Sequence, residues 1–174
     1  MMRPGRIIRE ATVADIIRIM PVMEAAKGIM RSDGNMNQWV GGYPSPEAIQ
    51  ADIDRNGGFV IEDPERSQSI VGYFAFLPSP EPTYDYIEGG EWLDDEMPYH
   101  VIHRIASYPD VHGIFSDIME FCFARDPNIR IDTHHDNSIM RHNISKSGFT
   151  YCGIIYLESG DQRLAYQRIL NQEA

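Results

Sequence analysis

The feature that most constrains the fold is a pair of strand-to-helix junctions that follow one another in the chain. A run rich in β-branched residues at 99–106 ends in the turn 109–113, and apolar residues at helical spacing begin at Ile114. A second strand-like run, 129–133, leads into the polar stretch 134–137 and another helical stretch. If the two strands lie parallel in one sheet, both junctions meet at the same edge, where α/β proteins usually bind ligands.

The remaining segments predict a mixed α/β sheet with helices packed on it. A strand at 6–11 ends at Thr12, and Asp15 three residues later resembles a capping box, so a helix is expected over 13–30. Pro21 lacks a backbone donor and is expected to kink or split that helix. The other expected elements are a helix from Pro46, a hairpin of 59–62 and 70–77, helices from Ile114 and at 139–146, and final strands at 151–157 and 164–169.

The composition limits the partners and the compartment. The 174 residues, 43% of them hydrophobic, suit one domain that spans residues 1–174. Lys and Arg number 15 against 26 Asp and Glu, and a net charge of −11 should repel phosphate backbones, so we expect no nucleic-acid partner. No run approaches the ~20 apolar residues that cross a bilayer, and Cys122 and Cys152 form no CxxC pattern. We therefore expect a cytoplasmic chain without a membrane span, disulfide scaffold or structural zinc.

The junction at Gly113 has the chemistry of an anion site. A helix N-terminus presents unpaired backbone N–H groups and the positive end of the helix dipole. A turn that comes close before such a helix can hold a pyrophosphate. The alternative is that Gly113 only makes a tight left-handed turn.

Four segments match a known pattern when they are taken together. The most specific is Asn137, followed at a fixed spacing by Lys-x-Gly-Phe at 146–149. The others are the opening 8–12, the hairpin end 70–73, and the strand and turn 103–113. With these segments the chain resembles the GNAT superfamily of acyl-CoA-dependent N-acetyltransferases over nearly all of its length.

The resemblance implies a fold, a co-substrate and a reaction. The fold is a central mixed, mostly antiparallel sheet of about six to seven strands flanked by helices, with two splayed parallel strands at its centre. Acetyl-CoA would be the co-substrate, without a metal, and the primary amine of a small molecule or peptide would attack its thioester directly. Such a reaction needs a general base for the amine and stabilisation of the leaving thiolate.

The resemblance also assigns the residues that would bind the co-substrate. Backbone groups of Ile105, Ala106 and Ser107 would pair with the pantetheine arm, and Asn137 would lie beside it. The amides that wrap the pyrophosphate would be those of His112, Gly113, Ile114, Phe115 and Ser116.

Three positions depart from the family pattern. Asp110 stands where relatives usually start the pyrophosphate turn with Gln or Arg, and Phe115 replaces the second Gly or Ala. Ile144 stands where many relatives place a tyrosine that protonates the thiolate. These changes leave an alternative open, a GNAT-like module that binds acyl-CoA or another ligand without turnover.

Histidine suits the role of base because its side chain ordinarily titrates near pH 6.5. His103, on the strand 99–106, is the first candidate, with a hydrogen-bonded, half-buried histidine as the structural alternative, and His134 is the second. Weaker candidates are Glu88 and Asp132 as bases, and His142 and Ser145 as substitutes for the missing acid. Strict alternation along the first strand places Val101, His103 and Ile105 on one face and Ile102, Arg104 and Ala106 on the other.

Two further groups of residues have alternative interpretations. Adjacent strand residues point to opposite faces, so His134, His135 and Asp136 should not converge on one ion, and we expect no metal. Aromatic residues in the loops line an acceptor pocket, or serve as a lid or a dimer contact, which leaves a homodimer open. They are Trp39, Tyr43, Tyr84 and Trp92.

Overall fold

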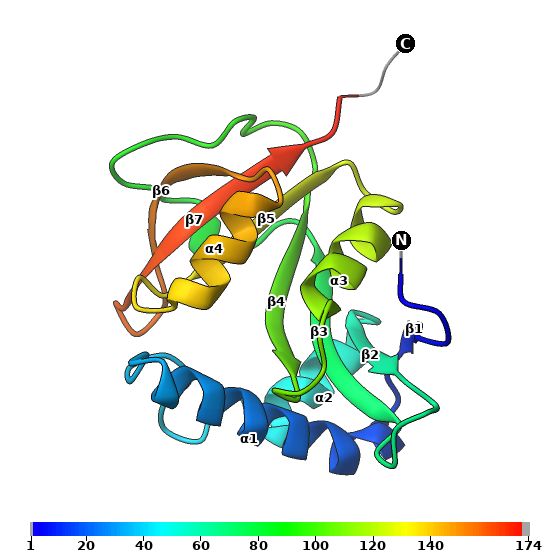
Figure 1. Cartoon of the computed structure of the whole chain (residues 1–174). Coiled ribbons are helices and arrows are strands. Elements are labelled where there is room, and N and C mark those ends of the chain that lie inside the picture. Colours follow the sequence, from blue (N-terminus) through cyan, green and yellow to red (C-terminus); the bar gives the residue numbers. More distant parts are fainter. Residues whose placement is uncertain (1, 172–174) are drawn as a thin grey trace.

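The computed structural model describes residues 2–171, which form a seven-stranded sheet in the order β1-β2-β3-β4-β5-β7-β6 (Figure 1). β4 and β5 are parallel, and the other neighbouring strands are antiparallel. The expected mixed, mostly antiparallel sheet is therefore confirmed. The strands are β1 (Ile7–Glu10), β2 (Gly58–Glu62), β3 (Ile70–Pro78), β4 (His100–Ser107), β5 (Asn128–Thr133), β6 (Thr150–Tyr156) and β7 (Gln162–Ile169).

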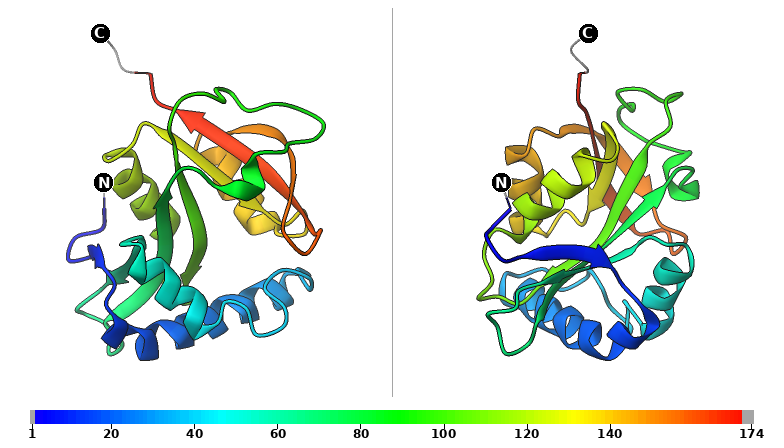
Figure 2. Two further views of the ribbon diagram at one scale, coloured as in Figure 1. Left: turned by 180° about the vertical axis from the view of Figure 1, so that it is seen from behind. Right: turned by 90° about the vertical axis from the view of Figure 1, so that its right-hand side faces the viewer.

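Helices cover both faces of the sheet (Figures 1 and 2). They are α1 (Ile16–Ser32), α2 (Pro46–Asp54), α3 (Ile114–Phe123) and α4 (Ser138–Lys146). Apolar residues of α3 and α4 pack with Phe59 and Ile61 of β2 on one face of the sheet. Val60, the residue between Phe59 and Ile61, packs with α1 and α2 on the other face. Because successive strand residues point to opposite faces, β2 is buried on both sides.

The start of α1 follows the sequence pattern, but its proline does not interrupt it. The Thr12 amide donates to Asp15 Oδ2 at 2.8 Å in the expected capping box, and one 3₁₀ turn precedes the helix. Pro21 lies inside a continuous helix, so the expected split is wrong. Pro21 is exposed, and Ile17, whose carbonyl loses its donor, is 79% exposed, so solvent can hydrate that carbonyl.

β4 contains a bulge that the alternating pattern does not predict. Its partner β3 pairs Tyr73 with Ala106 and Ala75 with His103, so two residues of β4 lie opposite one residue of β3. Arg104, one of the two, has φ +55°. The strict alternation expected for this strand is therefore wrong beyond His103.

β4 and β5 separate partway along their length. They pair only from His100 opposite Ile129 to Ile102 opposite Ile131, although β4 continues to Ser107 and β5 to Thr133. This separation confirms the expected pair of splayed parallel strands. It leaves the edge of β4 that faces β5 without a sheet partner beyond Ile102.

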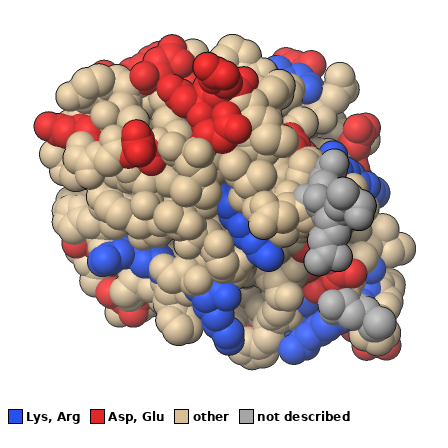
Figure 3. Space-filling view, turned by 90° about the horizontal axis from the view of Figure 1, so that it is seen from above, with Lys and Arg blue, Asp and Glu red and all other residues tan. Residues whose placement is uncertain are grey.

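The segment from Asp85 to Pro98 crosses the upper edge of the molecule in Figure 1 as an irregular chain. It carries six acidic residues, and Figure 3 shows Asp and Glu gathered on one side of the face seen from above. Its Trp92 and the preceding Tyr84 are buried against residues of β4, β6 and β7, so the segment is packed against the sheet. Within residues 2–171, no helix is long and apolar enough to span a bilayer.

Candidate functional site

Two cavities adjoin where β4 and β5 separate. The larger, of about 950 Å³, is lined by His103 and is called the His103 cavity here. The second, of about 550 Å³, lies at the start of α3 and is called the Gly113 cavity. Ile105 and Asn137 line both, so the two cavities share a wall.

The Gly113 cavity has a helix N-terminus at one end. Gly113 has φ +81°, a conformation that glycine adopts readily, and it is the N-cap of α3. The first intrahelical bond runs from the Asp117 amide to Gly113 O at 3.1 Å, so the amides of Ile114, Phe115 and Ser116 precede the helical bonding pattern. The predicted turn residues 112–116 all line this cavity, and the arrangement is suited to an anion.

The two unusual residues of the turn do not close this cavity. Phe115 is partly buried and packs against the hydrophobic core that includes Ile114 and Ile118. Asp110 forms an ion pair with Arg66, which lowers the pKa of the Asp110 carboxyl. The negative charge that Asp110 brings to the turn is therefore offset by a neighbouring cation.

Asn137 holds the shared wall in place. Its Oδ1 accepts a hydrogen bond from the Met140 amide at 3.1 Å, which caps α4. Its Nδ2 donates to Gln38 Oε1 at 3.0 Å, and Gln38 also accepts from Asn35 at 2.8 Å. Asn137 thus ties α4 to the loop that follows α1, directly beside the separated strands.

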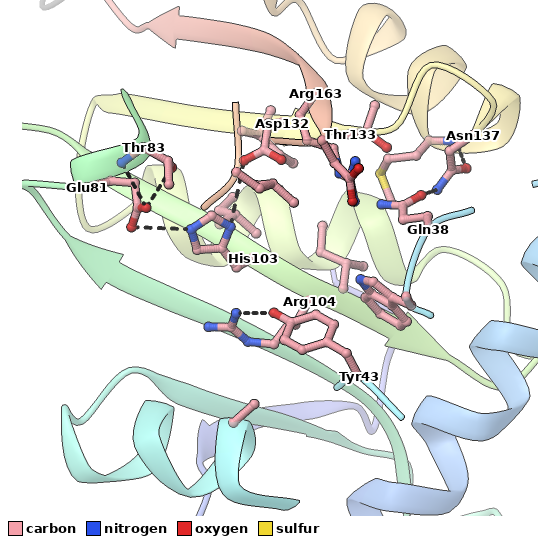
Figure 4. Close-up of a pocket in the computed structure, with 18 of the residues that line it drawn as sticks. Gln38, Tyr43, Glu81, Thr83, His103, Arg104, Asp132, Thr133, Asn137 and Arg163 are labelled. Atoms are coloured by element: carbon pink, nitrogen blue, oxygen red, sulfur yellow. Dashed lines mark hydrogen bonds and ion pairs between the residues drawn. The ribbon is translucent and has the colours of Figure 1, made fainter. Parts of the chain in front are cut away.

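His103 lies between two carboxylates in the larger cavity (Figure 4). Its Nε2 is 3.8 Å from Glu81 Oε2, and its Nδ1 is 3.8 Å from Asp132 Oδ2. The His103 side chain is 21% exposed, so it is accessible from the cavity. Each ring nitrogen of His103 therefore faces a carboxylate oxygen.

Hydrogen bonds orient both carboxylates. Tyr84 OH donates to Asp132 Oδ2 at 2.6 Å, and burial raises the pKa of this phenol, as does the carboxylate beside it. Thr83 Oγ1 donates to Glu81 Oε1 at 2.7 Å. The facing His103 ring, together with Thr83, lowers the pKa of Glu81 to about 2 although burial opposes this shift. Glu81 is therefore a fixed negative charge near neutral pH.

Arg104 also lines the His103 cavity. Its guanidinium makes two hydrogen bonds to buried Asp52, one of them from Nε at 2.8 Å, and a third to Tyr43 OH at 2.7 Å. Tyr73 OH also donates to Asp52, at 2.7 Å. The bulge in β4 lets Arg104 reach α2 while His103 faces the same cavity.

Comparison with solved structures decides the family. A GNAT-family acetyltransferase from Streptococcus agalactiae 2603 is 32% identical to this chain, with a TM-score of 0.86, over 97% of this chain and 98% of that one. The chain belongs to the GNAT family of acetyltransferases. Two more distant structures share the fold. One is a GNAT-family acetyltransferase from Listeria monocytogenes, with 19% identity over 95% of each chain and a TM-score of 0.69. The other is a chain of the NatC complex bound to Gag peptide and CoA, with 12% identity over 96% of this chain and 99% of that one and a TM-score of 0.59. No family model and no curated protein match the sequence.

Several predicted residues lie elsewhere in this GNAT fold. His134 is buried outside both cavities, where its Nδ1 accepts from the Asp136 amide at 3.0 Å. Glu88 pairs with β6 at the exposed segment and bonds Tyr156 OH. His142 and Ser145 are exposed on α4, away from the cavity walls. By contrast, Asp132 lies within the His103 cavity.

A turn brings three residues together that were expected to stay apart. The Asn137 amide bonds His134 O at 3.0 Å, which closes a turn after β5. Ligand atoms of His134, His135 and Asp136 consequently lie within 4.8 Å of one another. The expectation that strand alternation keeps them from converging is wrong, because the strand has already ended at Thr133.

The loop aromatics divide into two pairs. Trp39 and Tyr43 line the His103 cavity. Tyr84, just before the acidic segment, and Trp92, within it, are buried, and Trp92 Nε1 donates to Tyr84 O at 3.0 Å. Only Trp39 and Tyr43 are therefore placed to contact a ligand directly.

Sequence reasoning missed two charged residues of this GNAT site, Glu81 and Arg163. Both line the His103 cavity, yet they are 22 residues before and 60 residues after His103 in the sequence. Neither belongs to a motif. The one available signal for Glu81 is its place between Pro80 and Pro82, where an acidic residue ends the long strand β3 and begins a loop.

Proposed function

We propose that this GNAT protein transfers an acetyl group from acetyl-CoA to the primary amine of a small molecule or peptide. The observation that carries the proposal is His103, held between Glu81 and Asp132 in the cavity that opens where β4 and β5 separate. A cavity with a partly exposed histidine and fixed carboxylates is the setting in which a base can take a proton from an amine.

The residues around the Gly113 cavity fit the co-substrate. The free edge of β4 at Ile105, Ala106 and Ser107 offers backbone groups to an extended pantetheine arm, since β5 has turned away. The amides at the start of α3 suit the pyrophosphate. Asn137 lines both cavities, so the pantetheine arm would pass beside it on the way from the Gly113 cavity to the His103 cavity.

In the proposed reaction, acetyl-CoA supplies an acetyl group activated as a thioester, and a C–N bond to the amine forms as the C–S bond breaks. His103 accepts the proton that the amine nitrogen loses. Glu81 and Asp132 stabilise the resulting imidazolium, because both are anionic and 3.8 Å from its nitrogens. Ile144 is fully buried in the core and has no proton to donate, so it does not protonate the thiolate that leaves as the C–S bond breaks.

The alternative of a binding module without turnover is tested by the same experiment. Release of free CoA thiol from acetyl-CoA is followed with a panel of primary amines, for the wild type, His103→Gln and the exposed α4 variant His142→Gln. We expect amine-dependent thiol release by the wild type and His142→Gln, and a loss of about 100-fold or more in His103→Gln. Binding of CoA with no amine-dependent thiol release in the wild type would establish the binding module instead.

A further inference from the structure

Arg163 is a buried cation without a carboxylate partner in the wall of the His103 cavity. It is 7% exposed, and its one hydrogen bond within the described chain runs from Nη1 to the backbone oxygen of the preceding residue at 2.8 Å. No carboxylate of residues 2–171 lies within 4.0 Å of it. Burial lowers the pKa of this guanidinium, which reflects the cost of removing the charge from water. The carboxylates of Asp132 and Asp161 oppose this shift from beyond ion-pair distance.

The other arginines near this cavity are either paired with a carboxylate or exposed to solvent. Arg104 is neutralised by Asp52, and Arg55 is exposed at the end of α2. A buried charge is normally paired, because an unpaired one is strongly destabilising. The hydroxyl of Thr133, which lies near Arg163 in Figure 4, is also buried and has no hydrogen-bond partner among the described residues. Arg163 therefore remains available to a ligand, and the buried hydroxyl of Thr133 beside it is unsatisfied among the described residues.

The position of Arg163 relative to the catalytic histidine limits the size of that ligand. Ala165 of β7 pairs with Asp132 of β5, and Arg163 lies two residues before Ala165 on the same face. At about 3.4 Å per residue, Arg163 begins about 7 Å along the strand from Asp132. Asp132 faces His103, so a small molecule can contact the Arg163 guanidinium and the His103 ring at the same time.

We propose that the acceptor is a primary amine that carries a carboxylate close to its nitrogen, as a free amino acid does. Arg163 binds the carboxylate through its planar fork of N–H donors, and His103 faces the amine. This inference rests on the proposed function and names the substrate class of the same site. Glu81 and Asp132 favour the ammonium end of such a molecule, so its two charges meet opposite charges in the cavity.

The charge of the cavity favours a carboxylate over a phosphate ester. Five acidic residues line it, and Arg163 is the buried cation that remains unpaired within the described wall. One guanidinium balances a singly charged carboxylate, whereas a phosphate ester near neutral pH carries close to two charges. The surplus charge would be repelled by the acidic residues Glu158 and Asp161, which line the same cavity.

The first experiment compares matched acceptors. CoA release is measured with single amino acids, their amides, the corresponding decarboxylated amines, dipeptides and a phosphorylated amine. We expect kcat/KM for the best amino acid to exceed that for its amide by about 10- to 100-fold, the range of a charge-assisted hydrogen-bond pair. Equal or faster reaction of the amides, the decarboxylated amines, the dipeptides or the phosphorylated amine would overturn the inference while leaving acetyl transfer intact.

Variants separate the carboxylate contact from differences in amine basicity. The acid-to-amide ratio of kcat/KM is measured for the wild type, Arg163→Gln and Arg163→Lys, with Arg55→Gln as the matched exposed control. We expect the ratio to fall about 10-fold or more in Arg163→Gln, to fall less in Arg163→Lys, and to stay unchanged in Arg55→Gln. The thermal shift caused by CoA serves as the folding check, and an unchanged ratio in folded Arg163→Gln would overturn the inference. Absence of CoA release with every amine would instead refute the proposed function.

Discussion

His103 and Arg104 are consecutive residues of β4, yet both side chains line the same cavity. The bulge opposite Phe74 makes this possible, because two residues of β4 occupy the space of one. Arg104 takes the left-handed conformation and reaches Asp52 on α2. The strain of that conformation is offset by a bidentate ion pair, so the pair fixes the direction of β4 just where it leaves β5.

Removal of Arg104 should therefore destabilise the fold. In Arg104→Met, the carboxylate of Asp52 remains buried, and among residues 2–171 only the Tyr73 hydroxyl remains as its donor. We expect a loss of about 3–5 kcal/mol in the free energy of unfolding. Urea denaturation measures this loss. The double variant Arg104→Met/Asp52→Leu should recover a large part of it, because no unpaired charge is left. A double variant as unstable as the single one would show that the ion pair is not the cause.

Substitution of Gly113 should disturb the amides at the start of α3 and so weaken the binding of CoA. A β-carbon there would meet Arg3 Nε at 3.4 Å, an ordinary contact, so Gly113→Ala should lose stability mainly through its φ of +81°, by about 1–2 kcal/mol. Relief of that strain moves the amides, and we expect the CoA-induced thermal shift to fall strongly. Gly160→Ala is the matched control, because Gly160 has φ +89° with no atom within 4 Å of an added β-carbon. It should lose similar stability and keep the thermal shift.

Local patterns predict most of the elements and bring part of the candidate site to the right place in the fold. Ser45 caps α2 as its sequence indicates, with the Ala48 amide donating to its hydroxyl at 3.2 Å. Gly113 and Asn137 are the N-caps of α3 and α4 at the two expected junctions, because turns and helix caps depend on residues that are neighbours in the sequence. His103 was placed on the right strand for the same reason, since the run of β-branched residues around it is local.

The remaining features depend on contacts between distant segments. The bulge in β4 reflects its pairing with β3, and no pattern within β4 itself reveals it. Glu81 and Arg163 reach the cavity from a loop and from β7, so their proximity to His103 follows from the sheet order alone. Pro21 is tolerated because its side of α1 faces solvent, which the strand and helix patterns around it do not disclose.

Asn137 should contribute to both stability and CoA binding. Asn137→Ala removes the cap of α4, which we expect to cost about 1 kcal/mol of unfolding free energy. It also removes an amide from the wall between the cavities, and we expect CoA affinity to fall by about 5- to 30-fold, or 1–2 kcal/mol. Asn137→Asp separates the two effects, because an aspartate still accepts from the Met140 amide. Titration calorimetry on this variant should show weakened CoA binding with the cap retained, and full affinity in both variants would refute the binding role.

The lowered pKa of Glu81 should make the free energy of unfolding depend on pH. Its pKa is about 2 in the folded chain against an ordinary value of 4.5, so the unfolded chain binds a proton first as the pH falls. The stability that Glu81 contributes is fully present above about pH 4.5 and is lost as the pH falls toward 2. We expect Glu81→Gln to be less stable than the wild type at pH 7 and to lose less stability between pH 5 and about 3. Urea denaturation across this range measures both slopes, with Glu91→Gln, exposed on the same acidic segment, as the control. Parallel slopes for the wild type and Glu81→Gln would show that His103 and Thr83 do not hold the Glu81 carboxylate as the geometry indicates.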